Sequence, residues 1–222
     1  MTKPAPAPSV YPAYARSERI ADGTLHALGV AGALTGAAWL MIWSYGRVSG
    51  GESAALAVYG LALIATFSAS AIYHMTPWEG LRPTLRRIDH AAIYLKIAGT
   101  YTPLVVMIGS LTAYLVLIAV WALAAVGMVL KLFFWHNKSR NGIFLYLLMG
   151  WMCLVLIGAM IAVLPLAALA LISVGGLLYT AGVVFHVWES LKFSNAIWHG
   201  FVLAASACFF VAIALAAGSG IA

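Results

Sequence analysis

Charged side chains are scarce in this chain. They make up 8% of its 222 residues, whereas 64% of the residues are hydrophobic and the mean hydropathy is +1.00. A soluble globular domain carries roughly 25% charged residues. The composition therefore excludes an ordinary soluble domain and indicates an integral membrane protein.

Cysteine is almost absent as well, because Cys153 and Cys208 are the two examples. Both fall within long apolar stretches and no CxxC pair exists, so we expect neither a disulfide framework nor a cysteine-based metal knuckle. Residues 1–23 are rich in Pro and Ala and lack the basic, apolar and small-residue order of a cleaved signal peptide. We expect a disordered cytoplasmic tail over 1–23 and a single membrane domain over 24–222.

Long apolar stretches are what the sequence does contain. A bilayer core about 30 Å thick needs about 20 apolar residues per helix. These stretches are continuous and do not alternate as the strands of a barrel would, and an open sheet would leave backbone groups unpaired in lipid. The sequence therefore predicts an all-α bundle of seven membrane-spanning helices, at about 24–45, 54–74, 90–109, 111–134, 143–163, 166–188 and 197–219.

The basic residues are distributed unevenly between the two sides of this bundle. Ten of the twelve fall in the N-terminal tail and in every second connecting segment, only Arg47 falls on the opposite side, and Lys96 lies within a span. An excess of Lys and Arg marks cytoplasmic loops. We therefore expect the N-terminus in the cytoplasm and the C-terminus outside. The net charge of +6 is explained by this topology and predicts membrane lipids, not nucleic acid, as partners.

The few polar residues of the spans gather at the cytoplasmic edge. Glu18, Asp22 and His26 recur every four residues, and the same spacing separates Ser70 from His74. Residues four apart share one face of a helix, and ionisable groups within spans usually face the bundle interior and have a function. A cavity shared by several helix ends is therefore expected on this side.

Three of these residues form a candidate metal site. His74, Asp89 and His199 lie at the same edge although they are far apart in the chain. Zinc accepts imidazole nitrogen and carboxylate oxygen, and a catalytic zinc site combines three protein ligands with one open position. Asp89 could bind directly or through the water. The alternative is that Asp89 merely caps its helix and that the histidines form hydrogen bonds at the interface.

Six segments form a specific combination with the stripe of residues 18–26: SAIYH at 70–74, LRRIDHAAIY at 85–94, AGTYTP at 98–103, YLLMGW at 146–151, GGLLYT at 175–180 and AIWH at 196–199. Together they closely resemble the haemolysin III family, which belongs to the progestin and adipoQ receptor group. The resemblance covers nearly the whole bundle.

The resemblance implies a zinc ion near the cytoplasmic face of a seven-helix fold. The family binds it with one histidine from the second helix and two from the seventh, with an aspartate of the third helix nearby. His74, His199 and Asp89 match three of these roles, but Asn195 stands where the first histidine of the last helix is expected. A neutral amide is a poor zinc ligand, so His186, Asp22 or Asp89 is the candidate replacement.

The activity implied by the resemblance is hydrolysis of an acyl amide lipid, or sensing of such a lipid in membrane homeostasis. In this interpretation Asp89 takes a proton from water and Ser70 orients the oxygen. The alternatives are the cytolytic activity of a haemolysin and a receptor without chemistry whose metal site has degenerated. The expected location is the bacterial inner membrane.

Lys96 is an ionisable residue that these roles leave unused. It follows Asp89 by seven positions and so lies on nearly the same helical face, about 10 Å deeper at 1.5 Å per residue. Two interpretations are open for its side chain. It pairs with a carboxylate or a lipid headgroup, or it extends its stem back to the cytoplasmic surface.

Overall fold

The computed structural model describes residues 14–134, 141–188 and 190–219 of the chain. The described residues contain no strand, and seven of the helical segments are long and apolar enough to cross a membrane. The prediction of an all-α, seven-helix bundle is therefore confirmed. In chain order the elements are α1 (Arg16–Ser44), α2 (Gly50–Met75), η1 (Glu79–Leu81), α3 (Arg82–Ile108), α4 (Leu111–Phe133), α5 (Asn141–Trp151), η2 (Met152–Leu156), α6 (Ile157–Val163), α7 (Leu166–Val187) and α8 (Ser194–Ser219).

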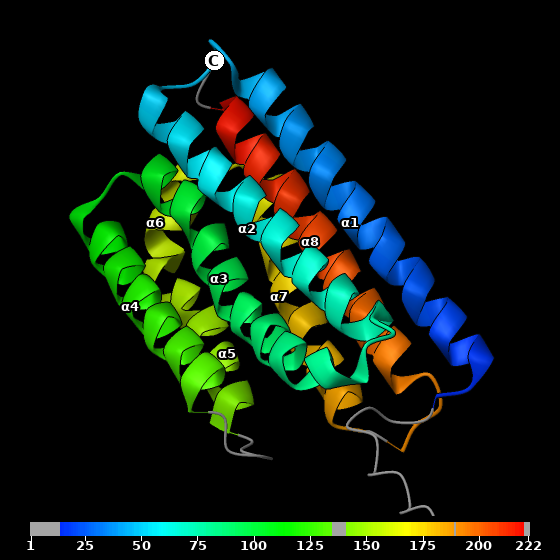
Figure 1. Cartoon of the computed structure of the whole chain (residues 1–222). Coiled ribbons are helices and arrows are strands. Elements are labelled where there is room, and N and C mark those ends of the chain that lie inside the picture. The colour runs from blue at the N-terminus through cyan, green and yellow to red at the C-terminus, as the bar shows by residue number, and fades with distance from the viewer. Residues whose placement is uncertain (1–13, 135–140, 189, 220–222) are drawn as a thin grey trace, which may run out of the picture.

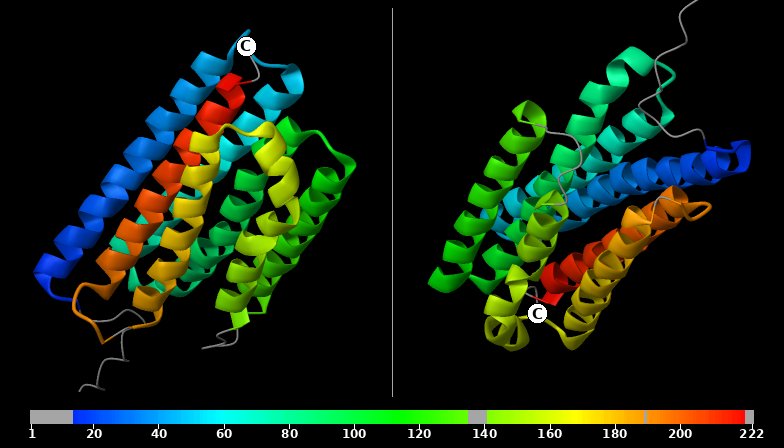
Figure 2. Two further views of the ribbon diagram at one scale, coloured as in Figure 1. Left: turned by 180° about the vertical axis from the view of Figure 1, so that it is seen from behind. Right: turned by 90° about the horizontal axis from the view of Figure 1, so that it is seen from below.

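The helices pack mainly against their neighbours in the chain. Close packing joins α1 to α2, α2 to α3, α3 to α4, and α7 to α8. The α7–α8 pair meets the first four helices through α1 and α3, and packs only sparsely on α5 and α6 (Figures 1 and 2). Large apolar side chains cover the outside of the spans, as lipid contact requires; examples are Ile42, Leu61, Leu115 and Leu166.

The two ends of the bundle differ in their chemistry, because the polar residues of the helices gather at one of them. The start of α1, α3 and α8 and the end of α2 and α7 all lie at the end opposite the C-terminus (Figure 1). α1 begins at Arg16, so residues 16–23 are helical and are not part of the expected tail. Residues 1–13 of that tail lie outside the described residues.

The fifth span differs from the expected continuous helix over 143–163. It consists of α5, the 3₁₀ segment η2 and α6. The Tyr101 hydroxyl of α3 donates to the carbonyl oxygens of Met149 and Gly150, at 2.8 and 3.0 Å. A change from α to 3₁₀ pairing leaves carbonyls without their usual partners, and the single Tyr101 hydroxyl proton is shared between two carbonyls beside the break.

Candidate metal centre

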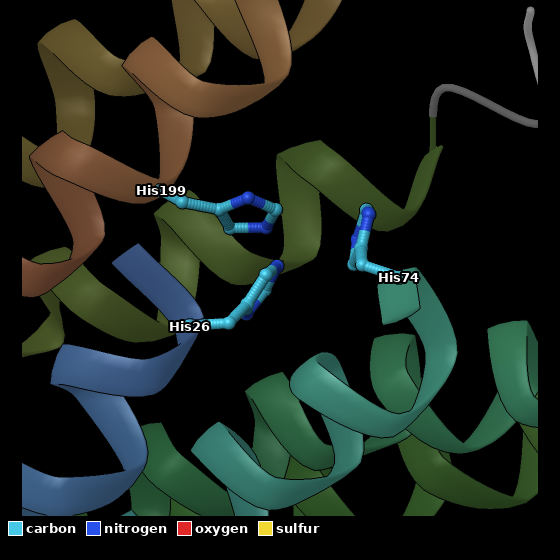
Figure 3. A group of neighbouring side chains, drawn as sticks. All are labelled: His26, His74 and His199. Atoms are coloured by element: carbon cyan, nitrogen blue, oxygen red, sulfur yellow. The ribbon is translucent and has the colours of Figure 1, made fainter. Parts of the chain in front are cut away.

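Three histidine rings converge at the polar end of the bundle. His26 of α1, His74 of α2 and His199 of α8 are 3%, 8% and 9% exposed. One ring nitrogen from each can be chosen so that all three lie within 4.8 Å of one another. The ring centroids are 4.3 to 5.0 Å apart, and Figure 3 shows the rings pointing toward one another from three helices. Such a group could hold a metal ion.

The early start of α1 brings two of its side chains into this group. Asp22 and His26 are four residues apart, so they lie on one helical face, and both are buried. Glu18 fixes this end of α1, because its carboxylate accepts hydrogen bonds from the backbone N–H groups of Ala15 and Phe193. The second bond ties α1 to the residue that directly precedes α8, and so places His26 beside His199.

A buried arginine sets the relation between α2 and α3. Arg82 donates to the Thr76 carbonyl at 2.7 Å and to Glu79 Oε1 at 2.8 Å. These bonds hold the end of α2 against the start of α3, and therefore His74 near Asp89. Because α3 begins at Arg82 with Leu81 as its N-cap residue, Asp89 lies well inside the helix and is not a cap.

Asp22 contacts more members of the centre than any other carboxylate of the described residues. Its Oδ1 lies 2.6 Å from His199 Nδ1, and its Oδ2 accepts a hydrogen bond from Asn195 Nδ2 at 2.8 Å. The same Oδ2 lies 3.5 Å from His26 Nε2 and 3.6 Å from His74 Nδ1. Among the described carboxylates, Asp22 therefore provides the negative charge closest to all three imidazoles.

The donor set suits a zinc ion. A histidine that binds metal commonly donates its other ring N–H to a carboxylate, and the His199–Asp22 contact leaves His199 Nε2 available. His26 Nε2 is a buried nitrogen with no well-formed hydrogen bond to any described residue. Imidazole nitrogens with a nearby carboxylate are ligands that zinc prefers, and an ion would give the isolated His26 nitrogen a partner.

Asp89 lies beside this group. Its Oδ2 is 4.0 Å from His74 Nε2, and its carboxylate interacts with the Ser70 hydroxyl one turn before His74. The structure thus brings together His74, His199, Asp89 and Ser70, as the sequence analysis expected. Asp89 flanks the three imidazoles on the α2–α3 side.

The remaining candidate ligands divide into two groups. Asn195 lies within the centre, where its Nδ2 is 3.1 Å from His74 Nδ1 in addition to its bond to Asp22. His186 lies elsewhere, with its ring 4.9 Å from that of Trp198 and 6.3 Å from that of His90. Asn195 therefore supports the imidazoles through hydrogen bonds, whereas His186 is outside the cluster.

His26 is the centre's third imidazole, and it was not among the residues predicted to bind a metal ion. The spacing of Glu18, Asp22 and His26 had placed it on the correct face. The expected start at residue 24, however, left His26 at the margin of the first span. The signal that could have identified it is that same four-residue stripe, once the helix is extended to Arg16.

A large cavity leads away from the centre into the bundle. Its volume is about 970 Å³, and its lining includes His26, His74, Asp89 and His199 at the polar end. Leu104 lies at the other end, fifteen residues beyond Asp89 on α3 and therefore about 22 Å deeper. The walls between these ends are mainly apolar side chains of α3, α5, η2, α6, α7 and α8.

Fold and site together define a seven-helix membrane protein with a histidine group buried at one end of the bundle. The sequence profile described as Haemolysin-III related matches residues 15–210. The chain therefore belongs to the haemolysin III family, and the resemblance seen in its sequence is confirmed.

Relatives in bacteria and animals cover most of the chain. The chain is 34% identical to the Hemolysin-3 homolog of Bacillus subtilis (strain 168) over 199 residues, which cover 88% of this chain and 92% of that protein. It is 32% identical to Hemolysin-3 of Bacillus cereus over 197 residues, covering 88% and 90%. The human monocyte to macrophage differentiation factor is 32% identical over 167 residues, covering 70% and 67%. With seven apolar helices and this membership, the protein is a multi-pass integral membrane protein.

Proposed function

We propose that this protein is a zinc-dependent membrane protein whose buried centre hydrolyses or senses acyl amide lipids. The observation that carries the proposal is the convergence of three buried imidazoles on one end of a long, mainly apolar cavity. Ligand sites of this kind combine an apolar wall with a few polar groups.

His26, His74 and His199 would hold the ion, and Asp22 would orient the His199 ring through its 2.6 Å contact. A bound zinc ion supplies Lewis acidity, which polarises a substrate carbonyl and makes water a stronger acid. The three side chains that would hold the ion come from three helices, so the packing of the bundle fixes their relative positions.

Asp89 is the proposed general base. It lies beside His74 and interacts with the Ser70 hydroxyl, which restrains the orientation of its carboxylate. In amide hydrolysis the oxygen of water bonds to the acyl carbon, Asp89 accepts the proton, and the carbon–nitrogen bond breaks. The amine leaves with a proton, and the acyl group becomes a carboxylic acid.

The cavity supports a lipid as the substrate class. Its apolar walls extend about 22 Å from the level of Asp89 to that of Leu104, which is a length suited to an extended acyl chain. The same arrangement serves a sensor if the lipid binds and is not cleaved. Hydrolysis and sensing therefore share one ligand class and differ in turnover.

Metal binding is tested first, by elemental analysis of detergent-purified protein before and after chelation. We expect about one zinc per chain, as for a site with three protein ligands. The zinc content should fall to background in each of three variants, His26→Ala, His74→Ala and His199→Ala. His186→Ala is the matched control and should retain it. Full zinc content in all three variants, with the folded state verified by size exclusion, would rule out the proposed centre.

Turnover is tested separately, with a fluorogenic long-chain acyl amide and the zinc-loaded protein. Asp89→Asn should retain zinc and lower kcat by about 10²-fold or more, because positioned general bases contribute about 10² to 10⁴. If wild-type protein with zinc binds the amide without cleaving it, the hydrolase half is excluded and the sensing half remains. Failure to bind the amide excludes both.

A further inference from the structure

Lys96 is buried in the middle of the bundle and does not extend to the cytoplasmic surface. Its side chain is on α3 and is 7% exposed. Nζ donates a hydrogen bond to Ser206 Oγ of α8 at 2.6 Å. It also lies 4.6 Å from the ring centre of Phe67 and 5.1 Å from that of Tyr179.

Within the described residues, no carboxylate forms an ion pair with Lys96. An ammonium has three N–H donors, of which Ser206 takes one, and the two aromatic faces attract the charge without neutralising it. Ionisable groups at this depth are costly, and they commonly face a functional cavity with a partner of opposite charge. We therefore expect the oppositely charged partner of Lys96 to be a bound ligand.

The surroundings of Lys96 form a second polar level in the same cavity. Lys96 follows Asp89 by seven residues, and Ser206 follows His199 by seven residues, so both lie about 10 Å deeper than the histidine centre. Lys96 and Tyr179 line the cavity, and the Tyr179 hydroxyl is 2.9 Å from Ser206 Oγ. Beyond this level the lining continues to Leu104.

We propose that Lys96 and Tyr179, which line the cavity, bind the carboxyl group of a free, single-chain fatty acid. Ser206 positions the Lys96 ammonium, because it accepts a hydrogen bond from Nζ and donates its own to the Val202 carbonyl.

The cavity continues about 12 Å beyond Lys96 to the level of Leu104 and reaches the lipid-facing side at Leu154 and Ile161. A long chain therefore lies partly in the cavity and partly in the bilayer, and the ammonium supplies the opposite charge for its carboxylate. A bound ammonium–carboxylate pair has no net charge, which lowers the cost of burying Lys96 in the bundle. This site requires neither a metal ion nor turnover at the histidine centre.

A carboxylic acid suits this depth better than a lipid phosphate. The acid can enter the apolar cavity in its neutral form, and a Lys96 amine that is uncharged before binding takes the acid's proton, which forms the ammonium–carboxylate pair. A phosphodiester keeps its negative charge throughout, and an unpaired charge is expensive to move into an apolar medium. The Ser206 hydroxyl already donates to the Val202 carbonyl, so the ammonium is the main donor at this level, and it offers few N–H groups for the several oxygens of a phosphate.

The test is equilibrium binding of radiolabelled palmitate to the full chain in lipid nanodiscs, after chelation so that no metal contributes. Lys96→Met should weaken palmitate binding at least about tenfold, as loss of one partner of a buried charge pair does. Lys131→Met is the matched control and should bind palmitate like wild type, because Lys131 is not among the residues that line the cavity.

Competition with two other chains of the same length identifies the headgroup chemistry. On the wild-type protein, hexadecanol, which is neutral, should displace palmitate poorly. On the Lys96→Met protein, hexadecanol and palmitate should bind equally well. Hexadecyl phosphate should compete poorly on both. Equal competition by hexadecanol on wild type, or tighter binding of the phosphate, would overturn the assignment.

Protein stability provides a readout that remains valid if Lys96→Met folds poorly. On wild type alone, saturating palmitate should raise the melting temperature and hexadecanol should raise it less, because a ligand that binds only the folded state stabilises it. If Lys96 has only a structural role, palmitate and hexadecanol should raise the melting temperature equally. Loss of zinc binding or amide turnover would leave these results unchanged, so the two proposals fail separately.

Discussion

Asp22 illustrates how one carboxylate connects residues from three helices. It contacts His199 and Asn195 directly and is the charge nearest to His26 and His74. The family resemblance implied a histidine at position 195, where this chain has Asn195. In this chain the negative charge is on α1 and the amide is on α8, and the two side chains are hydrogen-bonded to each other.

Replacement of that charge gives a prediction at the scale of one residue. Asp22→Asn keeps the size of the side chain but removes the anionic partner of His199. Loss of a carboxylate that orients a metal-binding histidine typically costs about 10 to 100-fold in metal affinity. We expect a decrease of that size for zinc, measured by competition with a calibrated chelator.

The control for Asp22→Asn is the same chemical change at the other end of the bundle. Glu52 caps the start of α2 through Ser49, and Glu52→Gln should leave zinc affinity unaltered. An Asp22→Asn protein with wild-type affinity would show that the carboxylate has no part in holding the ion.

The packing of α2 against α3 depends on a glycine and belongs to the scale of the element. A Cβ on Gly99 would lie 2.5 Å from the Cβ of Ala62, which is closer than two such atoms can approach. α2 and α3 carry His74 and Asp89, so this close approach also positions the centre.

Gly99→Ala should therefore destabilise the bundle by about 1 to 3 kcal/mol, as overpacking of a filled core does. The measurement is chemical denaturation in detergent, followed by helical circular dichroism. Gly32→Ala is the control, because no atom lies within 4 Å of the added Cβ, and it should be neutral or slightly stabilising. Ala62→Gly should restore stability to the Gly99→Ala protein, and failure to do so would contradict the proposed contact.

The elements differ in how far the sequence could predict them. Continuous apolar runs predict spans because the bilayer sets their length. All seven spans overlap their expected positions, although α1 and α3 each begin eight residues earlier than expected. The break in the fifth span could not be predicted, because no proline marks Met152–Leu156 and the hydroxyl that bonds to the carbonyls beside it comes from Tyr101 of another helix.

The candidate site shows the same division between local and tertiary information. His74, His199 and Asp89 could be found from their shared edge of the bilayer and from the family segments. His26 required the true start of α1, where the Glu18 carboxylate accepts hydrogen bonds from the backbone N–H groups of Ala15 and Phe193, both outside the apolar run. A cavity at the polar edge was expected, but its extension deep into the bundle could not be predicted, because it depends on how α7 lies relative to α5 and α6.

At the scale of the whole molecule, the uneven distribution of basic residues predicts its orientation. The histidine centre and the basic connecting segments share one end of the bundle, and the C-terminus marks the other end (Figure 1). The positive-inside rule places the basic end in the cytoplasm. The zinc of the proposed centre would then be drawn from the cytoplasmic side.

Reporter fusions after Ala222 test this orientation. An alkaline phosphatase should be active there, since it folds outside the cytoplasm, and a green fluorescent protein exported unfolded should be dark. The reverse pattern would place the histidine centre on the outer side. Fusions after Lys192, in the segment before α8, serve as the internal control and should give the opposite result.

The position of the cavity also determines the units in which its occupancy should be expressed. Leu154, Ile161 and Leu177 belong to its lining and are more than half exposed, so the cavity reaches the lipid-facing side of the bundle. A solute that enters there is dissolved in the bilayer and not in water. Its occupancy follows its mole fraction among the membrane lipids. Adding lipid at a constant amount of solute therefore empties the cavity, even when the aqueous concentration of the solute hardly changes.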